Sequence, residues 1–315
     1  MVKSDEERGL RPMIRKLANR IHRSAITKSK TREITHYIQA GLPKEMRQAL
    51  EYLVSENSDS KTAAVVKIAE ARRREIVSMG DKKIPIWGSP KPGTSGHDSS
   101  IDARPQPVKF LEFTMERIAS TGKNQKWGTV LYLIAREFKS SVVIELGTCA
   151  GISAIYLSSA PNVKKLITVE GCEELANVAK EGLKICTNAK VVNALFDEAL
   201  DSQLPLLESK VDLAFIDGHH EKTATIHYFN RLVPFLDSRA VVIFDDISWS
   251  HDMRDAWNIL SRPEFAHCIE FGEIGVCIMK VEGDNSEAEP KYWDLQPILG
   301  EYPVSDGPNY WNWDL

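Results

Sequence analysis

Short apolar runs rich in β-branched residues recur through the second half of the chain. They lie at residues 142–144, 166–169, 211–216 and 240–244, and each is followed directly by an acidic residue. Short apolar runs bounded by turns are typical of strands that are buried on both faces, and a sheet of such strands is usually parallel with helices between them. The pattern therefore predicts an α/β fold, with a row of carboxylates at the strand ends.

The first 80 residues have helical periodicity instead. Helices are expected over Met13–Ile26, over Arg32–Val54 with a break at Gly41-Leu42-Pro43, and over Lys61–Met79, where Gly80 closes the last one. Residues 1–80 contain 17 Lys or Arg and 10 Asp or Glu, while the whole chain has a net charge of −4. A solvated basic face explains this better than a contact with RNA or a membrane surface.

Proline, glycine and serine interrupt the periodicity over residues 81–107, which predicts a linker or a lid. The expected organisation is a helical accessory region (1–80), this linker or lid (81–107), a cofactor-binding domain (108–280) and an acidic, aromatic tail (281–315). The tail carries Tyr292, Trp293, Tyr302, Tyr310, Trp311 and Trp313. Such a stretch is expected to pack on its own domain or on a partner subunit, so a homodimer stays open.

Length and composition agree with one sizeable core and an accessory region, since 43% of the 315 residues are hydrophobic and 27% are charged. No signal-peptide pattern and no apolar stretch of membrane-spanning length is present, so a cytoplasmic protein without a membrane partner is expected. The five cysteines include no C-x-x-C pair, which favours reduced thiols over a structural metal site.

A glycine-spaced turn follows the run at 142–144. Gly147 and Gly151 bracket it, and a helix is expected at about residues 152–159. By itself such a turn is equally well explained as structural. However, Glu170 ends the next strand about twenty residues later, where an acid can accept the ribose hydroxyls of an adenosine. Cys149 stands where a nicotinamide-binding turn needs glycine, so S-adenosylmethionine fits better, with Glu145 near its charged methionine half.

Three further acids follow neighbouring strands. Asp217 ends the run at 211–216, and Asp245 and Asp246 end the run at 240–244. Ligands gather at the carboxyl ends of parallel strands, and three converging carboxylates repel one another unless a cation joins them. The sequence therefore predicts a Mg²⁺ site at this edge. The alternative is that Asp245 caps the next helix and Asp246 is solvated.

The stretch from about Trp127 to Lys280 resembles a class I S-adenosylmethionine-dependent methyltransferase of the catechol O-methyltransferase-like group. The motifs that carry the resemblance are Glu145-Leu-Gly-Thr-Cys-Ala-Gly-Ile-Ser153, Phe215-Ile-Asp-Gly-His-His220 and Phe244-Asp-Asp-Ile-Ser-Trp-Ser250. The resemblance implies a doubly wound, seven-stranded, mostly parallel sheet of the Rossmann-like methyltransferase fold. Its antiparallel strand would come from a hairpin over Cys268–Phe271 and Val276–Lys280, with a turn at Glu273-Ile274-Gly275.

The resemblance also assigns roles to residues. It implies that Glu170 binds the ribose and that Phe196 and Asp197 flank the adenine. The methionine half would lie against Glu145, Gly147 and Gly151, and Thr148 and Ser153 would also bind the cofactor. Asp217, Asp245 and Asp246 stand at the metal-ligand positions, although the last is commonly Asn, which leaves metal use open. His220 stands where these enzymes place a lysine base, with Asp217 beside it, and imidazole titrates near neutral pH.

We therefore expect an O-methyltransferase that transfers the methyl group of S-adenosylmethionine to a hydroxyl of a small molecule, with Mg²⁺ as an optional second cofactor. Two alternatives stay open. The basic N-terminal helices could direct the methyltransferase domain to RNA, in which case binding would be salt-dependent. The domain could also bind cofactor without turnover, as a structural partner in an assembly.

Overall fold

The computed structural model describes residues 24–88, 109–260, 264–281, 289–300 and 302–304. The first expected helix, over Met13–Ile26, lies largely outside these residues, as do Tyr310, Trp311 and Trp313 of the tail. Within the described part of the chain, no helix combines the length and the apolar character needed to cross a membrane.

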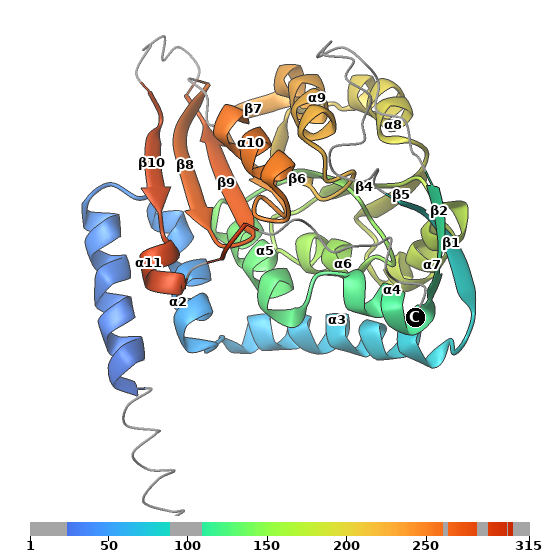
Figure 1. The fold of residues 1–315 in the computed structure, drawn as a ribbon, viewed down its shortest axis with the longest axis horizontal. Helices are drawn as coiled ribbons and strands as arrows, with labels where there is room; N and C mark the ends of the chain where they lie inside the picture. Colours follow the sequence, from blue (N-terminus) through green and yellow to red (C-terminus); the bar gives the residue numbers. More distant parts are fainter. Residues whose placement is uncertain (1–23, 89–108, 261–263, 282–288, 301, 305–315) are drawn as a thin grey trace, which may run out of the picture.

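A central sheet of eight strands organises the molecule (Figure 1). In spatial order the strands are β10 (Lys291–Asp294), β8 (Phe265–Phe271), β9 (Ile274–Met279), β7 (Leu236–Phe244), β6 (Val211–Ile216), β3 (Val142–Leu146), β4 (Lys165–Glu170) and β5 (Ala189–Asn193). The five strands from β7 to β5 are mutually parallel, and β9 is antiparallel to both β7 and β8. The mostly parallel α/β architecture expected from the sequence is confirmed.

The sheet differs from the expected one at its far edge. It has one strand more than the seven expected, because β10, from the segment predicted as a tail, pairs in parallel with β8. The hairpin turn also lies earlier than predicted. Phe271 pairs with Ile274, so the turn residues are Gly272 and Glu273, and Ile274 is fully buried at the start of β9.

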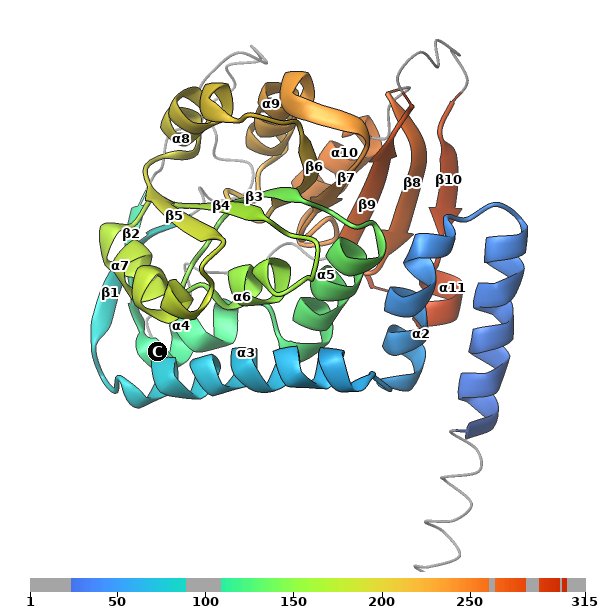
Figure 2. The ribbon, with the colours of Figure 1, turned by 180° about the vertical axis from the view of Figure 1, so that it is seen from behind.

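Helices cover both faces of the sheet, as a doubly wound fold requires (Figures 1 and 2). On one face lie α8 (Phe196–Gln203), α9 (Lys222–Leu232) and α10 (His251–Leu260). On the other lie α2 (Arg47–Ser55), α3 (Ser60–Ser78), α4 (Met115–Thr121), α5 (Gln125–Glu137), α6 (Ile152–Ser158) and α7 (Glu173–Gly182), with a helix over 24–39 beside α2. Short 3₁₀ turns and α11 (Gln296–Leu299) complete the elements; the turns are Lys44–Met46, Leu183–Ile185, Leu204–Leu206 and Val233–Phe235.

Alternation along each strand divides the core into two layers. Val142 and Ile144 belong to the layer beneath α8, α9 and α10, whereas Val143 belongs to the layer beneath α5 and α6. Successive side chains of a strand point to opposite faces, so a strand covered on both sides must be apolar throughout. The uninterrupted apolar runs in the sequence follow from this geometry.

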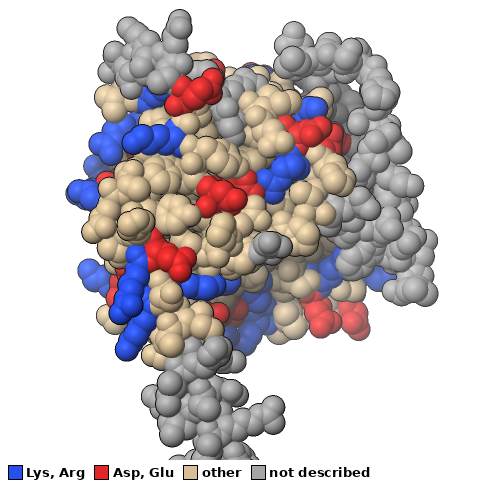
Figure 3. All heavy atoms as spheres, turned by 60° about the vertical axis from the view of Figure 1, so that its left-hand side comes forward, with Lys and Arg blue, Asp and Glu red and all other residues tan. Residues whose placement is uncertain are grey.

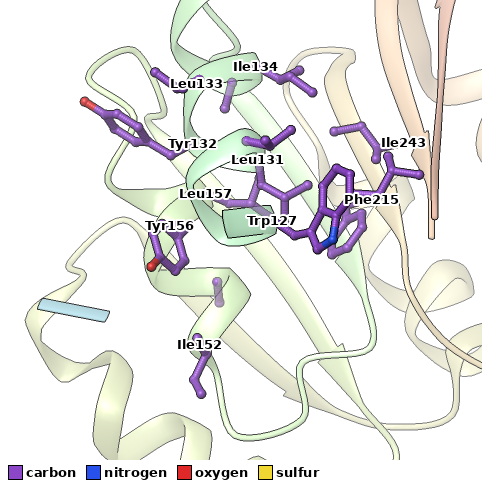
Figure 4. Packing of buried hydrophobic residues seen from close by; sticks show 14 of the residues in the cluster. Trp127, Leu131, Tyr132, Leu133, Ile134, Ile152, Tyr156, Leu157, Phe215 and Ile243 are labelled. Carbon is purple, nitrogen blue, oxygen red and sulfur yellow. The ribbon is translucent and has the colours of Figure 1, made fainter. Parts of the chain in front are cut away.

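Helix α5 carries the centre of the second layer. Asn124 caps it by accepting a hydrogen bond from the Trp127 backbone amide at 3.1 Å, and the residues from Trp127 to Ala135 are all buried. Figure 4 shows the Trp127 indole beside Phe215 and Ile243, which come from β6 and β7. The loop before α5 is therefore held against the carboxyl ends of these strands.

The N-terminal helices share this core rather than forming a separate one. Ile34, Leu50 and Ile76 belong to the same buried cluster as Val130 and Ile155. In addition, Asp59 caps α3 and pairs with Arg136 of α5 at 2.8 Å, an ion pair that joins the two regions.

Part of the segment predicted as linker or lid is a strand. β1 (Lys83–Gly88) pairs antiparallel with β2 (Lys109–Thr114) in a small second sheet. The described part of the tail packs on its own domain, as one of the two expectations had it. The Trp293 indole donates a hydrogen bond to His267 at 3.1 Å and lies 6.1 Å from the Tyr37 ring.

Charged side chains are interspersed on the face shown in Figure 3. Residues of both signs are visible on it, and several lysines and arginines lie close together on the left of the view. The N-terminal residues 1–23, which hold seven of the lysines and arginines, lie outside the described residues.

Candidate functional site

The register of the sheet brings the predicted site residues to one edge. Leu146 pairs with both Val169 and Ile216, and Ile216 pairs with Phe244, so the residues that follow these strands start at the same level. The loops that begin there have unusual backbones. Cys149, His219, His220 and Asp246 have positive φ angles of 48°, 68°, 25° and 54°. Left-handed conformations at non-glycine residues cost energy and cluster at functional sites.

The glycine turn packs directly on the loop after β6. Gly147 has φ 108°, and a Cβ built on it would lie 1.7 Å from the carbonyl oxygen of Asp217. The amides of Gly147 and Thr148 both donate to the carbonyl of Val169 at 3.0 Å. The missing side chain at Gly147 therefore allows close contact between two loops, a role that differs from the cofactor contact that the resemblance implied. Gly151, with φ 87°, begins α6 in the left-handed region.

Glu145 is completely buried beneath this turn. Its Oε2 accepts a hydrogen bond from the Thr168 hydroxyl, which also contacts the Thr148 hydroxyl. Its Oε1 is buried and accepts no hydrogen bond from the described residues. Burial raises the pKa of Glu145 to about 7, although the hydroxyls of Ser153 and Thr168 act in the opposite direction. Thr148 and Ser153, two predicted cofactor-binding residues, thus lie around this carboxyl group.

The Glu170 carboxyl group binds backbone amides at and beside the glycine turn. One carboxyl oxygen accepts from the Cys149 amide at 2.8 Å, and the other accepts from the Cys172 amide at 2.9 Å. Burial raises the pKa of Glu170 to about 7, and these amides only partly offset it. Each carboxylate oxygen can still accept a second hydrogen bond, so the group can bind two adjacent hydroxyls.

Phe196 and Asp197 lie on the other side of the Asp217 loop. A Cβ at Gly218 would lie 2.8 Å from the Phe196 ring, so glycine is needed for this approach. Asp197 is mostly buried, and its Oδ1 is bound by His227 at 2.7 Å and by Arg231 at 3.0 Å. These partners fix the Asp197 carboxylate at the start of α8, next to the ring.

The three aspartates predicted as metal ligands lie close enough together for their charges to interact. Desolvation and the charge of Asp245 raise the pKa of Asp217 well above its ordinary value, although Lys123 acts in the opposite direction. The pKa of Asp246 is raised by the same two causes. The Asp245 side chain is completely buried, and the ammonium of Lys123 forms an ion pair with it.

Lys123, in the loop before α5, was not anticipated at this edge. Its side chain is 10% exposed. Burial lowers the pKa of Lys123, but the charges of Asp245, Asp217 and Asp246 outweigh burial and hold the pKa well above its ordinary value. Burial also raises the pKa of nearby Glu273 to about 7. No local pattern in the sequence marks Lys123, because its partners lie far along the chain.

His220 lies between two of the aspartates. Its Nδ1 is 3.5 Å from Asp246 Oδ2, its Nε2 is 3.9 Å from Asp217 Oδ1, and its ring lies 5.7 Å from that of Trp249. Its side chain is 20% exposed, so a ligand can reach it. The neighbouring His219 instead contacts the Tyr228 hydroxyl at 3.0 Å, and burial lowers its pKa to about 4. His220 is thus the histidine of this pair that faces Asp217, Asp245 and Asp246, which together form the acidic edge of the site.

The arrangement does not fit a divalent metal as it stands. Among the described residues, no three carboxylate, histidine or cysteine side chains are grouped so that they could hold a metal ion. The cation at the acidic edge is the Lys123 ammonium, which would repel a metal bound to the same carboxylates. A metal at Asp217, Asp245 and Asp246 would therefore require Lys123 to move.

The sequence matches a known protein family over residues 144–247, and the family is described as a methyltransferase domain. This range contains the glycine turn, the loop with Asp217 and the loop with Asp245 and Asp246. The match confirms the resemblance to methyltransferases for this part of the chain.

Curated proteins similar to the chain include two O-methyltransferases. The chain is 28% identical over 134 residues to catechol O-methyltransferase of Mycobacterium tuberculosis, which covers 42% of this chain and 59% of that protein. It is 30% identical over 112 residues to O-methyltransferase imqG of Aspergillus flavus, covering 33% and 44%. The uncharacterized protein R132 of Acanthamoeba polyphaga mimivirus is 28% identical over 127 residues, covering 36% and 57%. The chain thus spans less than two thirds of the length of each relative.

Solved structures that the chain matches include O-methyltransferases at low sequence identity. The Bacillus cereus O-methyltransferase in complex with SAH is 15% identical with a TM-score of 0.45, and the match covers 73% of this chain and 94% of that one. TomG of Streptomyces achromogenes in complex with SAM is 20% identical with a TM-score of 0.43, covering 50% and 82%.

Proposed function

We propose that this chain, which matches a methyltransferase domain over residues 144–247, transfers the methyl group of S-adenosylmethionine to a hydroxyl oxygen of a small molecule. The observation that carries the proposal is the direct contact between the two halves of the site. The glycine turn with Glu145 and Glu170 lies against the Asp217 loop, which holds His220. A cofactor and an acceptor bound to these halves would be neighbours.

The residues of the turn suit S-adenosylmethionine. The unpaired, buried Oε1 of Glu145 is an acceptor that a ligand ammonium could satisfy, and an unsatisfied buried acceptor is costly. The two oxygens of Glu170 suit the adjacent hydroxyls of a ribose. The Phe196 ring offers an apolar surface to an adenine. When bound, S-adenosylmethionine would supply a methyl group on a sulfonium: an acceptor oxygen can attack the methyl carbon in line, and S-adenosylhomocysteine leaves with the electron pair of the broken C–S bond.

His220 is the proposed general base. Its imidazole accepts the proton of the acceptor hydroxyl, so that the oxygen gains nucleophilic character as it bonds to the methyl carbon. Asp246 and Asp217, at 3.5 and 3.9 Å from the ring nitrogens, stabilise the resulting imidazolium. A positioned base of this kind contributes roughly a hundredfold to ten-thousandfold in rate.

Mg²⁺ assistance stays a separate prediction. If Asp217, Asp245 and Asp246 held the ion, chelation would abolish turnover and leave cofactor affinity nearly unchanged. The position of Lys123 favours the version without a metal, because the acidic edge already has a cation.

A transfer assay tests the proposal. The protein is incubated with methyl-deuterated S-adenosylmethionine and a panel of phenols and sugars, and mass spectrometry detects the labelled products. We expect methylation of a hydroxyl, and His220→Ala should slow it by roughly a hundredfold or more. The exposed His251 at the start of α10 provides the control, since His251→Ala should leave the rate unchanged.

Other outcomes would contradict parts of the proposal. Label found only on amines or thiols would refute the hydroxyl acceptor. Tight cofactor binding without transfer to any acceptor would favour the alternative of a non-catalytic partner.

A further inference from the structure

The acidic edge contains a lysine that comes from a different part of the fold. Lys123 precedes α5, whereas Asp245 and Asp246 follow β7 and Asp217 follows β6. The Lys123 ammonium forms an ion pair with Asp245, whose side chain is completely buried. Neither oxygen of Asp245 accepts a hydrogen bond from the described residues. The ammonium is therefore what compensates the buried charge of Asp245 in this arrangement.

A second basic residue holds the loop that carries Lys123. Arg73 of α3 donates hydrogen bonds to the backbone carbonyls of Ala119, Gly122 and Lys123, the Gly122 contact being 3.3 Å long. Glu70, one turn earlier on α3, pairs with Arg73 at 3.1 Å and orients the guanidinium. Three carbonyls held by one planar guanidinium fix the path of this loop, which a lysine could not do.

We propose that Lys123 serves as a built-in cation at the acceptor site, in the place that a divalent ion would take, and that Arg73 positions it. This inference rests on the proposed methyl transfer. The Lys123 ammonium offsets the charge of the carboxylates and donates a hydrogen bond to the acceptor oxygen. His220 meanwhile takes the proton of the acceptor hydroxyl. Lys123 keeps its own protons throughout. The accessory helix α3 thereby contributes to the chemistry through Arg73.

The proposal has a consequence for metal binding that does not depend on turnover. Mn²⁺ is the probe, and its binding is followed by electron paramagnetic resonance. The wild-type protein should bind no Mn²⁺ at the acidic edge, because the ammonium occupies it. Lys123→Ala should bind Mn²⁺, and adding Asp245→Asn to that variant should remove the binding.

Lys126, three residues later, provides the matched control. Its ammonium lies over the Trp127 ring at 5.7 Å, so Lys126→Ala should behave as wild type. If the wild-type protein binds Mn²⁺ and Asp245→Asn removes that binding, the proposal is overturned, whatever the lysine variants show. If Lys123→Ala does not fold, Lys123→Met keeps the length of the side chain and removes only its charge.

Activity provides the second readout. Wild-type turnover should survive exhaustive EDTA treatment, and Lys123→Met should lower kcat by about a hundredfold to a thousandfold, the usual loss for one stabilising donor. Mg²⁺ should restore part of the activity of Lys123→Met only. Unchanged kcat in Lys123→Met, or loss of wild-type turnover in EDTA, would refute the role of Lys123. Failure of the methyl transfer itself would appear as no turnover in any variant, with the Mn²⁺ results intact.

Arg73→Lys tests the positioning role, because lysine cannot hold three carbonyls. We expect a lower kcat with little change in the KM for S-adenosylmethionine, since the cofactor turn is not touched. The exposed neighbour Arg74 is the control, and Arg74→Lys should have no effect. A rise in KM at unchanged kcat would show that Arg73 does not act through Lys123.

Discussion

The affinity for the cofactor should depend on pH through Glu170. Burial raises the pKa of this carboxyl to about 7, so near neutral pH the ligand-free protein holds a mixture of both forms. Two ribose hydroxyls donate best to the ionised form. For a pKa near 7, roughly a tenth of the groups are ionised at pH 6 and roughly nine tenths at pH 8. Affinity for S-adenosylhomocysteine should therefore rise about tenfold over this range.

Equilibrium dialysis with labelled S-adenosylhomocysteine at pH 6, 7 and 8 measures the effect. Burial also raises the pKa of Glu145 to about 7, so Glu145 adds to the wild-type rise, and Glu170→Gln should remove only the contribution of Glu170. Glu181→Gln, a change at an ion-paired side chain on α7 that is 65% exposed, should keep the wild-type slope. An affinity that falls with pH, or identical slopes in wild type and Glu170→Gln, would refute the reasoning.

Three further predictions concern the loops and edges around the site. In urea unfolding, Gly147→Ala should lower the free energy of unfolding by more than Gly80→Ala does. Both glycines have a positive φ, but only at Gly147 would the new Cβ lie 1.7 Å from a carbonyl oxygen. Gly80→Ala should cost about 1 to 2 kcal/mol, and equal losses for the two variants would contradict the close contact at Gly147. In the same assay, Glu270→Gln should lower the free energy of unfolding by about 3 kcal/mol. The Glu270 carboxylate lies 2.6 Å from the Arg254 guanidinium, which would lose its charge partner. An unchanged urea midpoint would refute this prediction. Retention on immobilised polynucleotide should be weak and insensitive to salt, and steep salt dependence would instead favour the RNA-directed alternative.

The strands that form the site could be predicted because they are buried on both faces. Residues 142–146 and 211–216 have no exposed face, so their apolar runs are nearly uninterrupted. β10 could not be predicted in the same way. Its sequence, Lys-Tyr-Trp-Asp, is mixed because it lies at the sheet edge, and its pairing with β8 depends on contacts distant in sequence. The hairpin turn was misplaced because two glycines, Gly272 and Gly275, flank the candidate positions.

The site was predictable as far as topology determines it. Parallel strands place the residues after their carboxyl ends side by side, which brings Glu145, Glu170, Asp217 and Asp245 together. Lys123 and Arg73 enter the site from outside this topology. Their positions depend on how α3 and the loop before α5 pack on the sheet, and no spacing in the sequence records that packing.

Calorimetry with S-adenosylmethionine and NAD tests the central claim most directly. The glycine turn, Glu145 and Glu170 are proposed to bind S-adenosylmethionine. We predict a dissociation constant in the micromolar range, which corresponds to roughly 7 to 8 kcal/mol of binding free energy, and weaker binding by Glu170→Ala. NAD should give no heat of binding. Binding of NAD without binding of S-adenosylmethionine would contradict the account.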